Sequence, residues 1–128
     1  MGNADGTFLP AVSYQSHGIA GYSIDVADLD GDGRLDLIVA DYCNLTCTSG
    51  GGISVLLGNG DGTFNPATFF ATDGLPHALV VADVNGDGKA DLVVAIPGNL
   101  RWNTRIEILL GNGAVSYTHL TLPTICSV

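Results

Sequence analysis

Basic residues are scarce in this 128-residue chain, which has four Lys and Arg against thirteen Asp and Glu and a formal net charge of −9. Such a chain offers no basic patch, so we expect neither nucleic acid nor an anionic membrane surface as a partner. Long hydrophobic runs are also lacking, and no stretch approaches the roughly 18 apolar residues of a membrane-spanning helix. We therefore expect no membrane insertion. The first residues also lack the basic and apolar regions of a signal peptide.

Catalytic patterns are lacking too. No Ser-His-Asp order, Cys–His pair or phosphate-binding loop stands out, and His17 and His77 have no partner at a useful spacing. We predict that both histidines are structural or solvated and that the chain is not an enzyme. Apolar residues, at 46%, and 18 glycines are abundant instead. This composition excludes a disordered chain and fits one domain.

The sequence repeats itself at a period of about 55 residues. Three pairs of segments match: residues 23–42 with 78–97, residues 2–8 with 58–64, and residues 53–60 with 106–113. Within each period, short β-branched or apolar runs are bounded by Asn-Gly and Asp-Gly turn signals. These runs predict strands at residues 22–27, 35–40, 53–57, 67–71, 78–82, 90–96 and 105–110. No window shows helical apolar spacing, and four short strands per period are typical of a propeller blade.

Two acidic loops occupy equivalent places in the repeat. They read Asp28-Leu-Asp30-Gly-Asp32-Gly-Arg34-Leu-Asp36 and Asp83-Val-Asn85-Gly-Asp87-Gly-Lys89-Ala-Asp91. Oxygen-bearing side chains fall at loop positions 1, 3, 5 and 9, and the glycine at position 6 permits a sharp turn. At position 7, Arg34 or Lys89 offers a backbone carbonyl while its side chain projects to solvent. Calcium takes about six to eight oxygen ligands, so we predict two Ca²⁺ ions, one in each loop.

Other interpretations of the loops fit less well. Asp-Gly pairs also make hairpin turns, but a turn needs only one or two such residues, and two carboxylates about 4 Å apart repel by about 4 kcal/mol at an effective dielectric of about 20. An EF-hand requires Glu at position 12 and flanking helices, whereas position 12 is Val39 or Val94 in a predicted strand. The second loop also resembles a dockerin repeat, but a dockerin continues into a helix.

The loop pattern Asp-x-Asp-x-Asp-Gly-x-x-Asp leads into Leu-x-Val-Ala, and Gly-Asn-Gly-Asp-Gly-Thr-Phe stands between the copies. Over residues 1–113 this combination resembles the FG-GAP/VCBS repeats of integrin-type β-propellers. The resemblance implies calcium binding by the loops 28–36 and 83–91 in an extracellular or cell-surface protein. The fold class that we predict is all-β: a partial β-propeller of about two four-stranded blades with calcium-binding loops between strands.

From this resemblance we expect a calcium-binding repeat segment of a larger secreted or surface protein that mediates adhesion or ligand binding. Its expected partners are calcium, a protein or glycan ligand, and the flanking blades of the full-length protein. The alternative is a set of non-catalytic accessory repeats of an extracellular enzyme, such as a polysaccharide-degrading hydrolase or lyase. Because two blades cannot close a ring, we expect unpaired apolar faces and aggregation, with four exposed residues in particular: Val55, Leu57, Ile106 and Ile108.

The last residues depart from the repeat. After Gly113 the repeat predicts Asp-Gly-Thr-Phe, but the chain reads Ala-Val-Ser-Tyr. Residues 115–124 resemble one reading frame of a common transposase sequencing adapter. We therefore expect residues 1–113 to form the repeats and residues 114–128 to be a non-native, adapter-derived tail whose removal leaves stability unchanged. A genuine C-terminal strand is the alternative.

Cys43 and Cys47 lie in an insertion, residues 41–52, that the second repeat lacks. Two cysteines without a nearby His make poor zinc ligands, so we favour a disulfide in an oxidising compartment over a metal site. Asn44 begins a glycosylation sequon, which has meaning only in a eukaryotic secretory host. Trp102 lies in a loop, where it either covers a blade edge or stacks on a sugar or peptide.

Overall fold

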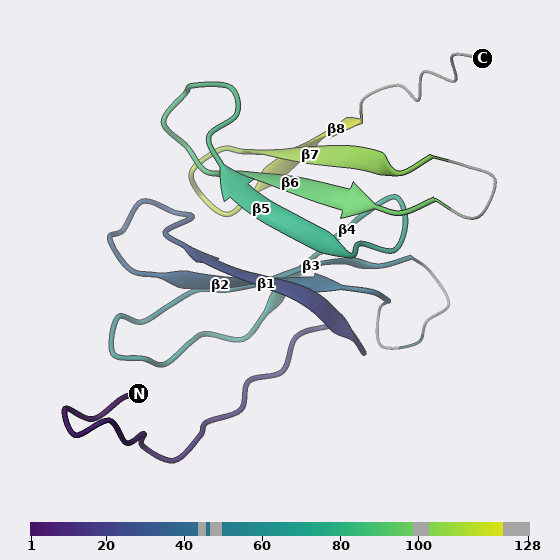
Figure 1. Cartoon of the computed structure of the whole chain (residues 1–128). Coiled ribbons are helices and arrows are strands. Elements are labelled where there is room, and N and C mark those ends of the chain that lie inside the picture. The colour runs from purple at the N-terminus through teal and green to yellow at the C-terminus, as the bar shows by residue number, and fades with distance from the viewer. Residues whose placement is uncertain (44–45, 47–49, 99–102, 122–128) are drawn as a thin grey trace.

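The computed structural model of the chain describes residues 1–43, 46, 50–98 and 103–121, with the side chains of residues 119–121 excepted. The described residues form eight strands: β1 (Gly21–Ala27), β2 (Asp36–Asp41), β3 (Gly52–Leu56), β4 (Thr68–Ala71), β5 (Ala78–Ala82), β6 (Asp91–Ile96), β7 (Arg105–Gly111) and β8 (Tyr117–Thr121). They make two four-stranded antiparallel sheets, in the orders β1-β2-β3-β4 and β5-β6-β7-β8 (Figure 1). The all-β prediction of two four-stranded blades is confirmed.

The strands form where β-branched residues alternate between two environments. In β2 and β3, Ile38 lies opposite Val55 and Ala40 opposite Ile53, and all four side chains face the second sheet. The intervening residues face the other side, because successive side chains of a strand point to opposite faces. The same alternation in β6 and β7 places Leu92 opposite Leu109.

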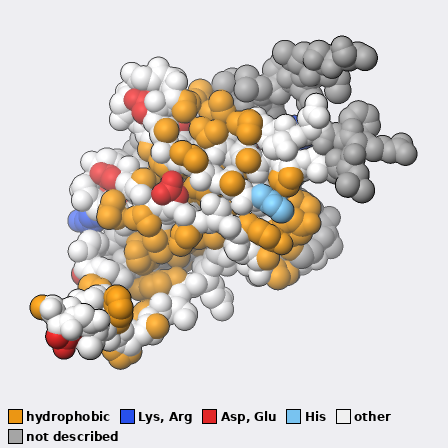
Figure 2. Space-filling view, in the orientation of Figure 1, with side chains coloured by type: hydrophobic (Ala, Val, Ile, Leu, Met, Phe, Trp, Pro, Cys, Tyr) orange, Lys and Arg blue, Asp and Glu red, His pale blue; other side chains and the backbone are white. Residues whose placement is uncertain are grey.

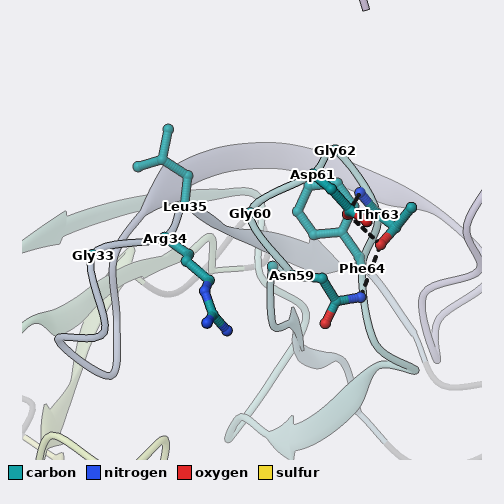
Figure 3. A pocket seen from close by; sticks show the side chains of 10 residues that line it. Gly33, Arg34, Leu35, Asn59, Gly60, Asp61, Gly62, Thr63 and Phe64 are labelled. Carbon is teal, nitrogen blue, oxygen red and sulfur yellow. Dashed lines mark hydrogen bonds between the residues drawn. The ribbon is translucent and has the colours of Figure 1, made fainter.

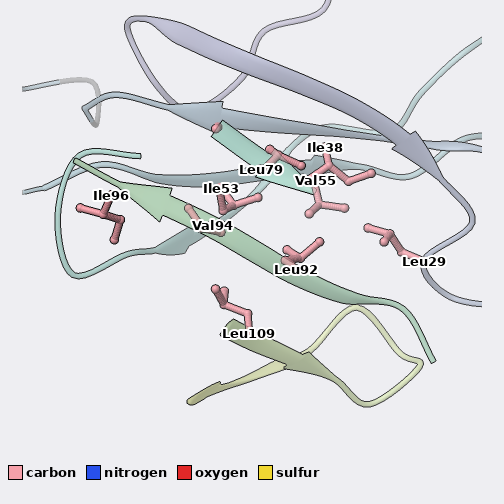
Figure 4. Close-up of a cluster of buried hydrophobic side chains, with 10 residues drawn as sticks. Leu29, Ile38, Ile53, Val55, Leu79, Leu92, Val94, Ile96 and Leu109 are labelled. Atoms are coloured by element: carbon pink, nitrogen blue, oxygen red, sulfur yellow. The ribbon is translucent and has the colours of Figure 1, made fainter. Parts of the chain in front are cut away.

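The core lies between the two sheets (Figure 4). The first sheet and its first loop contribute Leu29, Ile38, Ala40, Ile53 and Val55, and the second sheet contributes Leu79, Leu92, Val94, Ile96 and Leu109. Each is at most 6% exposed. Burial of a single Leu, Ile or Val side chain stabilises a fold by about 1.5–3 kcal/mol. The combined burial of these side chains therefore stabilises the packing of one sheet on the other.

The sheets are also joined along their first strands. The backbone N–H of Val81 in β5 donates to Asp25 Oδ2 in β1 at 3.2 Å. At one end of the two strands, the ring of Tyr22 stacks on that of His77, with centroids 4.6 Å apart and planes 9° apart. His77 therefore makes a structural ring contact while remaining exposed.

The segment before β1 has the same local structure as the chain that connects the first sheet to the second. Its Gly2–Phe8 bridge corresponds to the Gly58–Phe64 bridge. Its ring contact also recurs: Tyr14 meets Phe64 edge-to-face at 5.4 Å, and Phe70 meets Tyr117 at 5.1 Å. His17 contacts β3 through Ser54 and β4 through Phe69. In the same way, Phe70 of β4 and Asp73 of the following linker contact Tyr117 and Glu107 of the second sheet.

The segment before β1 and the linker after β4 make equivalent hydrogen bonds, each to the third strand of one sheet. The backbone N–H of His17 donates to Ser54 Oγ at 3.0 Å, and that of Asp73 donates to Glu107 Oε2 at 3.0 Å. His17 Nε2 also lies 2.8 Å from the carbonyl oxygen of Ala67. His17 thus makes structural contacts while it remains exposed, in agreement with the prediction of a structural or solvated residue.

The sequence-based expectation of four unpaired apolar residues is correct in part. Val55 is 1% exposed and belongs to the core between the sheets, so the expectation was wrong for this residue. Its strand β3 is internal to the first sheet and faces the second. Ile106 is 43% exposed on the outer side of β7, as expected, whereas Leu57 and Ile108 are half-buried.

The C-terminal residues 117–121 form β8, which the list of predicted strands omits. β8 pairs with β7, with Tyr117 opposite Gly111, and Tyr117 packs against the core. These residues occupy the place of a fourth strand, which is the alternative that the sequence left open. The origin of residues 114–128 stays a prediction, but their removal would take away a paired strand.

Cys43 is buried and disulfide-bonded. Three other residues that the sequence singled out, Asn44, Cys47 and Trp102, lie outside the described residues. The part of the chain that the structure describes contains no helix long and apolar enough to cross a membrane.

Candidate metal centre

The two acidic loops are equivalent hairpin connections. The first joins β1 to β2 and the second joins β5 to β6, so each follows the first strand of its sheet. Both loops lie at the same end of the two sheets, on the left in Figure 1. The topology therefore presents two acidic loops on one side of the molecule.

Asp28, at position 1, organises the first loop. Its Oδ1 accepts the backbone N–H groups of Gly31 at 2.8 Å and Asp32 at 3.1 Å, and its Oδ2 accepts that of Gly33 at 2.8 Å. Gly31 and Gly33 have φ of 77° and 84°, a left-handed conformation that favours glycine. The position 6 glycine makes the sharp turn that the sequence predicted, and the position 4 glycine makes a second one.

The second loop has the same geometry. Asp83 accepts the backbone N–H groups of Gly86 at 2.8 Å, Asp87 at 3.1 Å and Gly88 at 2.8 Å. Asn85 Oδ1 accepts the N–H of Asp87 at 3.2 Å, as Asp30 Oδ1 in the first loop accepts that of Asp32 at 3.1 Å. The loops therefore differ at position 3 in charge and not in hydrogen bonding.

Position 9 connects each loop to the interior of its sheet. Asp36 is 1% exposed, and its two oxygens accept the backbone N–H groups of Leu29 at 2.9 Å and Gly58 at 2.8 Å. A Cβ on Gly58 would lie 2.0 Å from the carbonyl oxygen of Leu35, so only glycine fits this approach. The sequence predicted Asp36 as a metal ligand but not this anchoring role.

The second loop repeats the anchor. Asp91 is 0% exposed and accepts the N–H groups of Val84 at 3.0 Å and Gly111 at 2.9 Å. A Cβ on Gly111 would lie 2.1 Å from the carbonyl oxygen of Ala90. The sequence does carry a sign of this anchor, because both Ile-x-x-Leu-Leu-Gly segments end in the glycine that donates to the buried carboxylate. From the sequence alone, the two segments indicate only a repeat.

Three of the four predicted carboxylate ligands of the first loop converge. Asp28, Asp30 and Asp36 each place a carboxylate oxygen within 4.8 Å of the others. Asp32 does not belong to this group. Its Oδ1 accepts the N–H of Arg34 at 2.8 Å, and its Oδ2 lies 3.4 Å from Arg34 Nη1. The sequence therefore predicted the cluster but not the turn of Asp32 towards Arg34.

One carboxylate of this cluster, that of Asp30, has a shifted pKa. Desolvation is the largest cause and raises the pKa of Asp30 above its ordinary value. The backbone hydrogen bond from Asp32 is the next cause and lowers this pKa, while the charges of Asp32, Asp36 and Asp28 raise it. A bound cation would remove this electrostatic cost, because it turns mutual repulsion into shared attraction.

The position 7 side chains lie beside a second turn. Arg34 and the turn at residues 59–63 line an open cavity of about 660 Å³ (Figure 3). A Cβ on Gly60 would lie 3.3 Å from Arg34 Cδ, so the Arg34 side chain runs along this turn. It stays 54% exposed, in agreement with its expected projection to solvent. Lys89 lies on Gly113 in the same way, and the metal-binding role of the two backbone carbonyls stays a prediction.

The turn at residues 59–63 is held by its own side chains (Figure 3). Asn59 Nδ2 donates to Thr63 Oγ1 at 2.9 Å, and Thr63 donates its hydroxyl to Asp61 Oδ1 at 2.6 Å and its N–H at 2.9 Å. These bonds, the hydroxyl first, lower the pKa of Asp61. This Asp-Gly segment is therefore a plain turn, in contrast to the two acidic loops.

Two face-to-face antiparallel sheets, each with an acidic loop after its first strand, place the chain in the class of β-propeller repeat modules. The family model described as FG-GAP-like repeat matches residues 1–39 and 42–94, and the FG-GAP repeat model matches residues 75–117. The chain belongs to the FG-GAP repeat family. Such repeats are generally non-catalytic and occur mostly in extracellular or surface proteins. Comparison with curated proteins and with solved structures gave no match.

Proposed function

We propose that this chain is a calcium-binding β-propeller repeat module of a secreted or surface protein, with one Ca²⁺ in each acidic loop. The observation that carries the proposal is the convergence of Asp28, Asp30 and Asp36 within 4.8 Å. Hard oxygen ligands on a tightly curled loop suit calcium, and the position 7 carbonyl together with waters would complete its coordination. Bound calcium would hold the loops at the common end of the two sheets.

Two further features support the proposal. The fixed backbone N–H donors around Asp28 and Asp83 hold those carboxylates in place, so a cation would meet preorganised ligands. The disulfide-bonded Cys43 fits an oxidising compartment. The module would serve adhesion or ligand binding, with a protein or glycan as the ligand.

The loops offer a reciprocal experiment, because position 3 is Asp30 in one and Asn85 in the other. Titration calorimetry of the wild-type chain with calcium should give two sites, the tighter in the first loop. Asp30→Asn should weaken the tighter site, and Asn85→Asp should strengthen the other. Asp28→Asn together with Asp83→Asn should abolish both sites.

Asp61→Asn is the matched control, since Asp61 lies in an Asp-Gly turn that makes no carboxylate cluster. This variant should leave the stoichiometry and both affinities unchanged. Absence of calcium binding by the wild-type chain, or binding that survives the double substitution at Asp28 and Asp83, would contradict the proposal.

A further inference from the structure

We propose that Asn112 is a site of spontaneous chemical modification, at which the side-chain amide is hydrolysed to aspartate or isoaspartate. The chain has three Asn-Gly pairs, at residues 59–60, 85–86 and 112–113. In such a pair the backbone nitrogen of the glycine can attack the asparagine side chain, because glycine has no Cβ to obstruct the approach. The inference concerns amide chemistry and does not rest on calcium binding by the loops.

The reaction needs water and no other reactant. The backbone nitrogen of Gly113 bonds to Cγ of Asn112, the Cγ–Nδ2 bond breaks, and ammonia leaves with the proton of the glycine N–H. Water then opens the resulting five-membered imide. Attack of water on the side-chain carbonyl leaves aspartate, and attack on the main-chain carbonyl leaves isoaspartate, which has one extra carbon in the main chain.

The glycine nitrogen, which is the nucleophile, differs among the three pairs. Exposure does not distinguish them, because all three asparagines are exposed. The N–H of Gly86 donates to Asp83 Oδ1 at 2.8 Å, so this nitrogen is held against a carboxylate that disfavours loss of its proton. Among the described residues, the N–H groups of Gly60 and Gly113 have no such acceptor.

The side-chain carbonyl, which is the electrophile, also differs. Asn112 Oδ1 accepts the backbone N–H of Ala114 at 2.9 Å. This donor stabilises the negative charge that develops on the oxygen when Cγ is attacked. Asn85 Oδ1 accepts the N–H of Asp87 at 3.2 Å in the same way, so the pair at 85–86 differs from the pair at 112–113 in its nucleophile alone.

Asn59 is held by its nitrogen instead. Its Nδ2 donates to Thr63 Oγ1 at 2.9 Å, and this hydroxyl in turn donates to Asp61. The residue equivalent to Asp61 in the second repeat is Ala114, so the second turn lacks this arrangement and Asn112 directs its oxygen to the main chain. Of the three pairs, all of which lie in the described part of the chain, only the last combines a polarised carbonyl with a free nucleophile.

The product forms at the acidic end of the molecule. Figure 2 shows acidic side chains, in red, at the left end of the sheets, where the β1–β2 and β5–β6 loops lie. Lys89 of the second loop lies along Gly113, with Cδ 3.5 Å from the position of a Cβ there. Modification adds one negative charge beside this loop, and isoaspartate lengthens the main chain directly after Gly111, whose N–H donates to Asp91 at 2.9 Å. Isoaspartate should therefore loosen the anchor of the second acidic loop.

The rates at the three asparagines test the assignment within one sample. The wild-type chain is incubated at mildly alkaline pH in calcium-free buffer, folded or unfolded in urea, and mass spectrometry follows the gain in mass as each amide becomes a carboxyl. Trypsin cleaves after Lys and Arg, so Asn112 falls in the peptide 106–128, and the other two fall in the peptide 35–89, where fragmentation distinguishes them.

The folded chain should react fastest at Asn112. The reaction at Asn85 should be roughly 10- to 100-fold slower, the effect on a rate of one charge-assisted hydrogen bond, and the reaction at Asn59 about fivefold slower, the effect of a neutral one. In urea the three rates should converge, because each asparagine then precedes a glycine in a chain without these hydrogen bonds.

Thr63→Val isolates the bond that holds Asn59. Valine lacks the hydroxyl, so the folded-state rate at Asn59 should rise while the rate in urea stays the same. Thr7→Val is the matched control, because Thr7 accepts the Asn3 amide at 2.8 Å in the equivalent N-terminal turn. Circular dichroism establishes that both variants fold, and the comparison within the wild-type chain needs neither. Equal rates in the folded chain, a slower reaction at Asn112 than at either other asparagine, or an unchanged Asn59 rate in folded Thr63→Val would overturn the proposal.

Discussion

Asp36 and Gly58 are joined across the first sheet: the backbone N–H of Gly58 donates to Asp36 Oδ1 at 2.8 Å. Asp91 and Gly111 make the same bond in the second sheet at 2.9 Å. Each buried carboxylate thereby fixes the end of its acidic loop to the end of β3 or β7. The candidate metal centre and the fold consequently share residues, and stability experiments report on both.

Gly58→Ala should destabilise the fold. The added Cβ would lie 2.0 Å from the Leu35 carbonyl oxygen, and the shift that relieves this clash weakens the bond to buried Asp36. A lost hydrogen bond to a buried group costs about 1–3 kcal/mol. Gly2→Ala is the matched control, because the equivalent Cβ meets only Phe8, at 3.7 Å. Equal urea midpoints for the two variants would contradict this account.

Asp25→Ala should weaken the junction between the sheets. Asp25 accepts the N–H groups of Val26 and Val81, so its removal leaves two backbone donors without this partner. We expect a loss of about 1–3 kcal/mol in urea unfolding. Asp25→Asn keeps one acceptor oxygen and should lose less. If the two substitutions cost the same, the hydrogen bonds to Asp25 do not hold the junction.

Tyr117 should matter through its ring and not through its hydroxyl. The hydroxyl is buried without a hydrogen-bond partner among the described residues, so Tyr117→Phe should be neutral or slightly stabilising. Tyr117→Ala should cost about 3 kcal/mol, because the ring packs on Phe70 and the core. Truncation after Gly113 should cost at least as much. An unchanged melt after truncation would favour the adapter-derived interpretation of the tail.

Tyr117 should also make the stability of the fold depend on pH in the alkaline range. Burial, followed by the charges of Asp36 and Asp91, raises the pKa of Tyr117 to about 12. A raised pKa means that the folded state binds the proton more tightly, so this stabilisation is complete below about pH 10 and is lost as the pH rises towards 12. Tyr117→Phe should reduce the loss of stability over this range. An identical alkaline profile in wild type and variant would refute the assignment.

Thr63→Val should raise the pKa of Asp61 towards its ordinary value. The Thr63 hydroxyl is the main cause of the lowered pKa, and removing it takes away the strongest bond to the ionised carboxylate. The stabilisation from ionised Asp61 is present above the unfolded-state pKa and is lost as the pH falls through the folded-state value. An NMR titration of the Asp61 carboxyl measures the change, with Asp5 in its equivalent turn as an internal reference.

Most of the strands follow from local sequence. Residues 78–82 were predicted as a strand with the observed bounds, and residues 35–40 differ from β2 by one residue at each end. Alternation of β-branched residues and the Asp-Gly turn signals are local, so they can be read from the chain. β8 was only the alternative prediction, because residues 114–116 lack the turn residues that mark the equivalent place in the first repeat and residues 115–124 resemble a sequencing adapter.

The candidate site was predicted as a set of ligands but not as a set of contacts. Spacing alone placed Asp28, Asp30 and Asp36 together, because they belong to one short loop. The bond between Asp36 and Gly58 joins residues that are distant in sequence, and the pairing of Asp32 with Arg34 depends on the turn geometry. Neither is visible in a pattern of residue types.

The most direct test of calcium binding compares thermal melts of the wild-type chain in excess calcium and in chelator at matched ionic strength. At free calcium about 100 times the dissociation constant, each occupied site adds about 2.7 kcal/mol to the free energy of unfolding. Calcium should therefore raise the melting temperature of the wild-type chain, and the double variant Asp28→Asn, Asp83→Asn should show no rise. Superimposable wild-type curves in calcium and in chelator would contradict the proposed calcium sites.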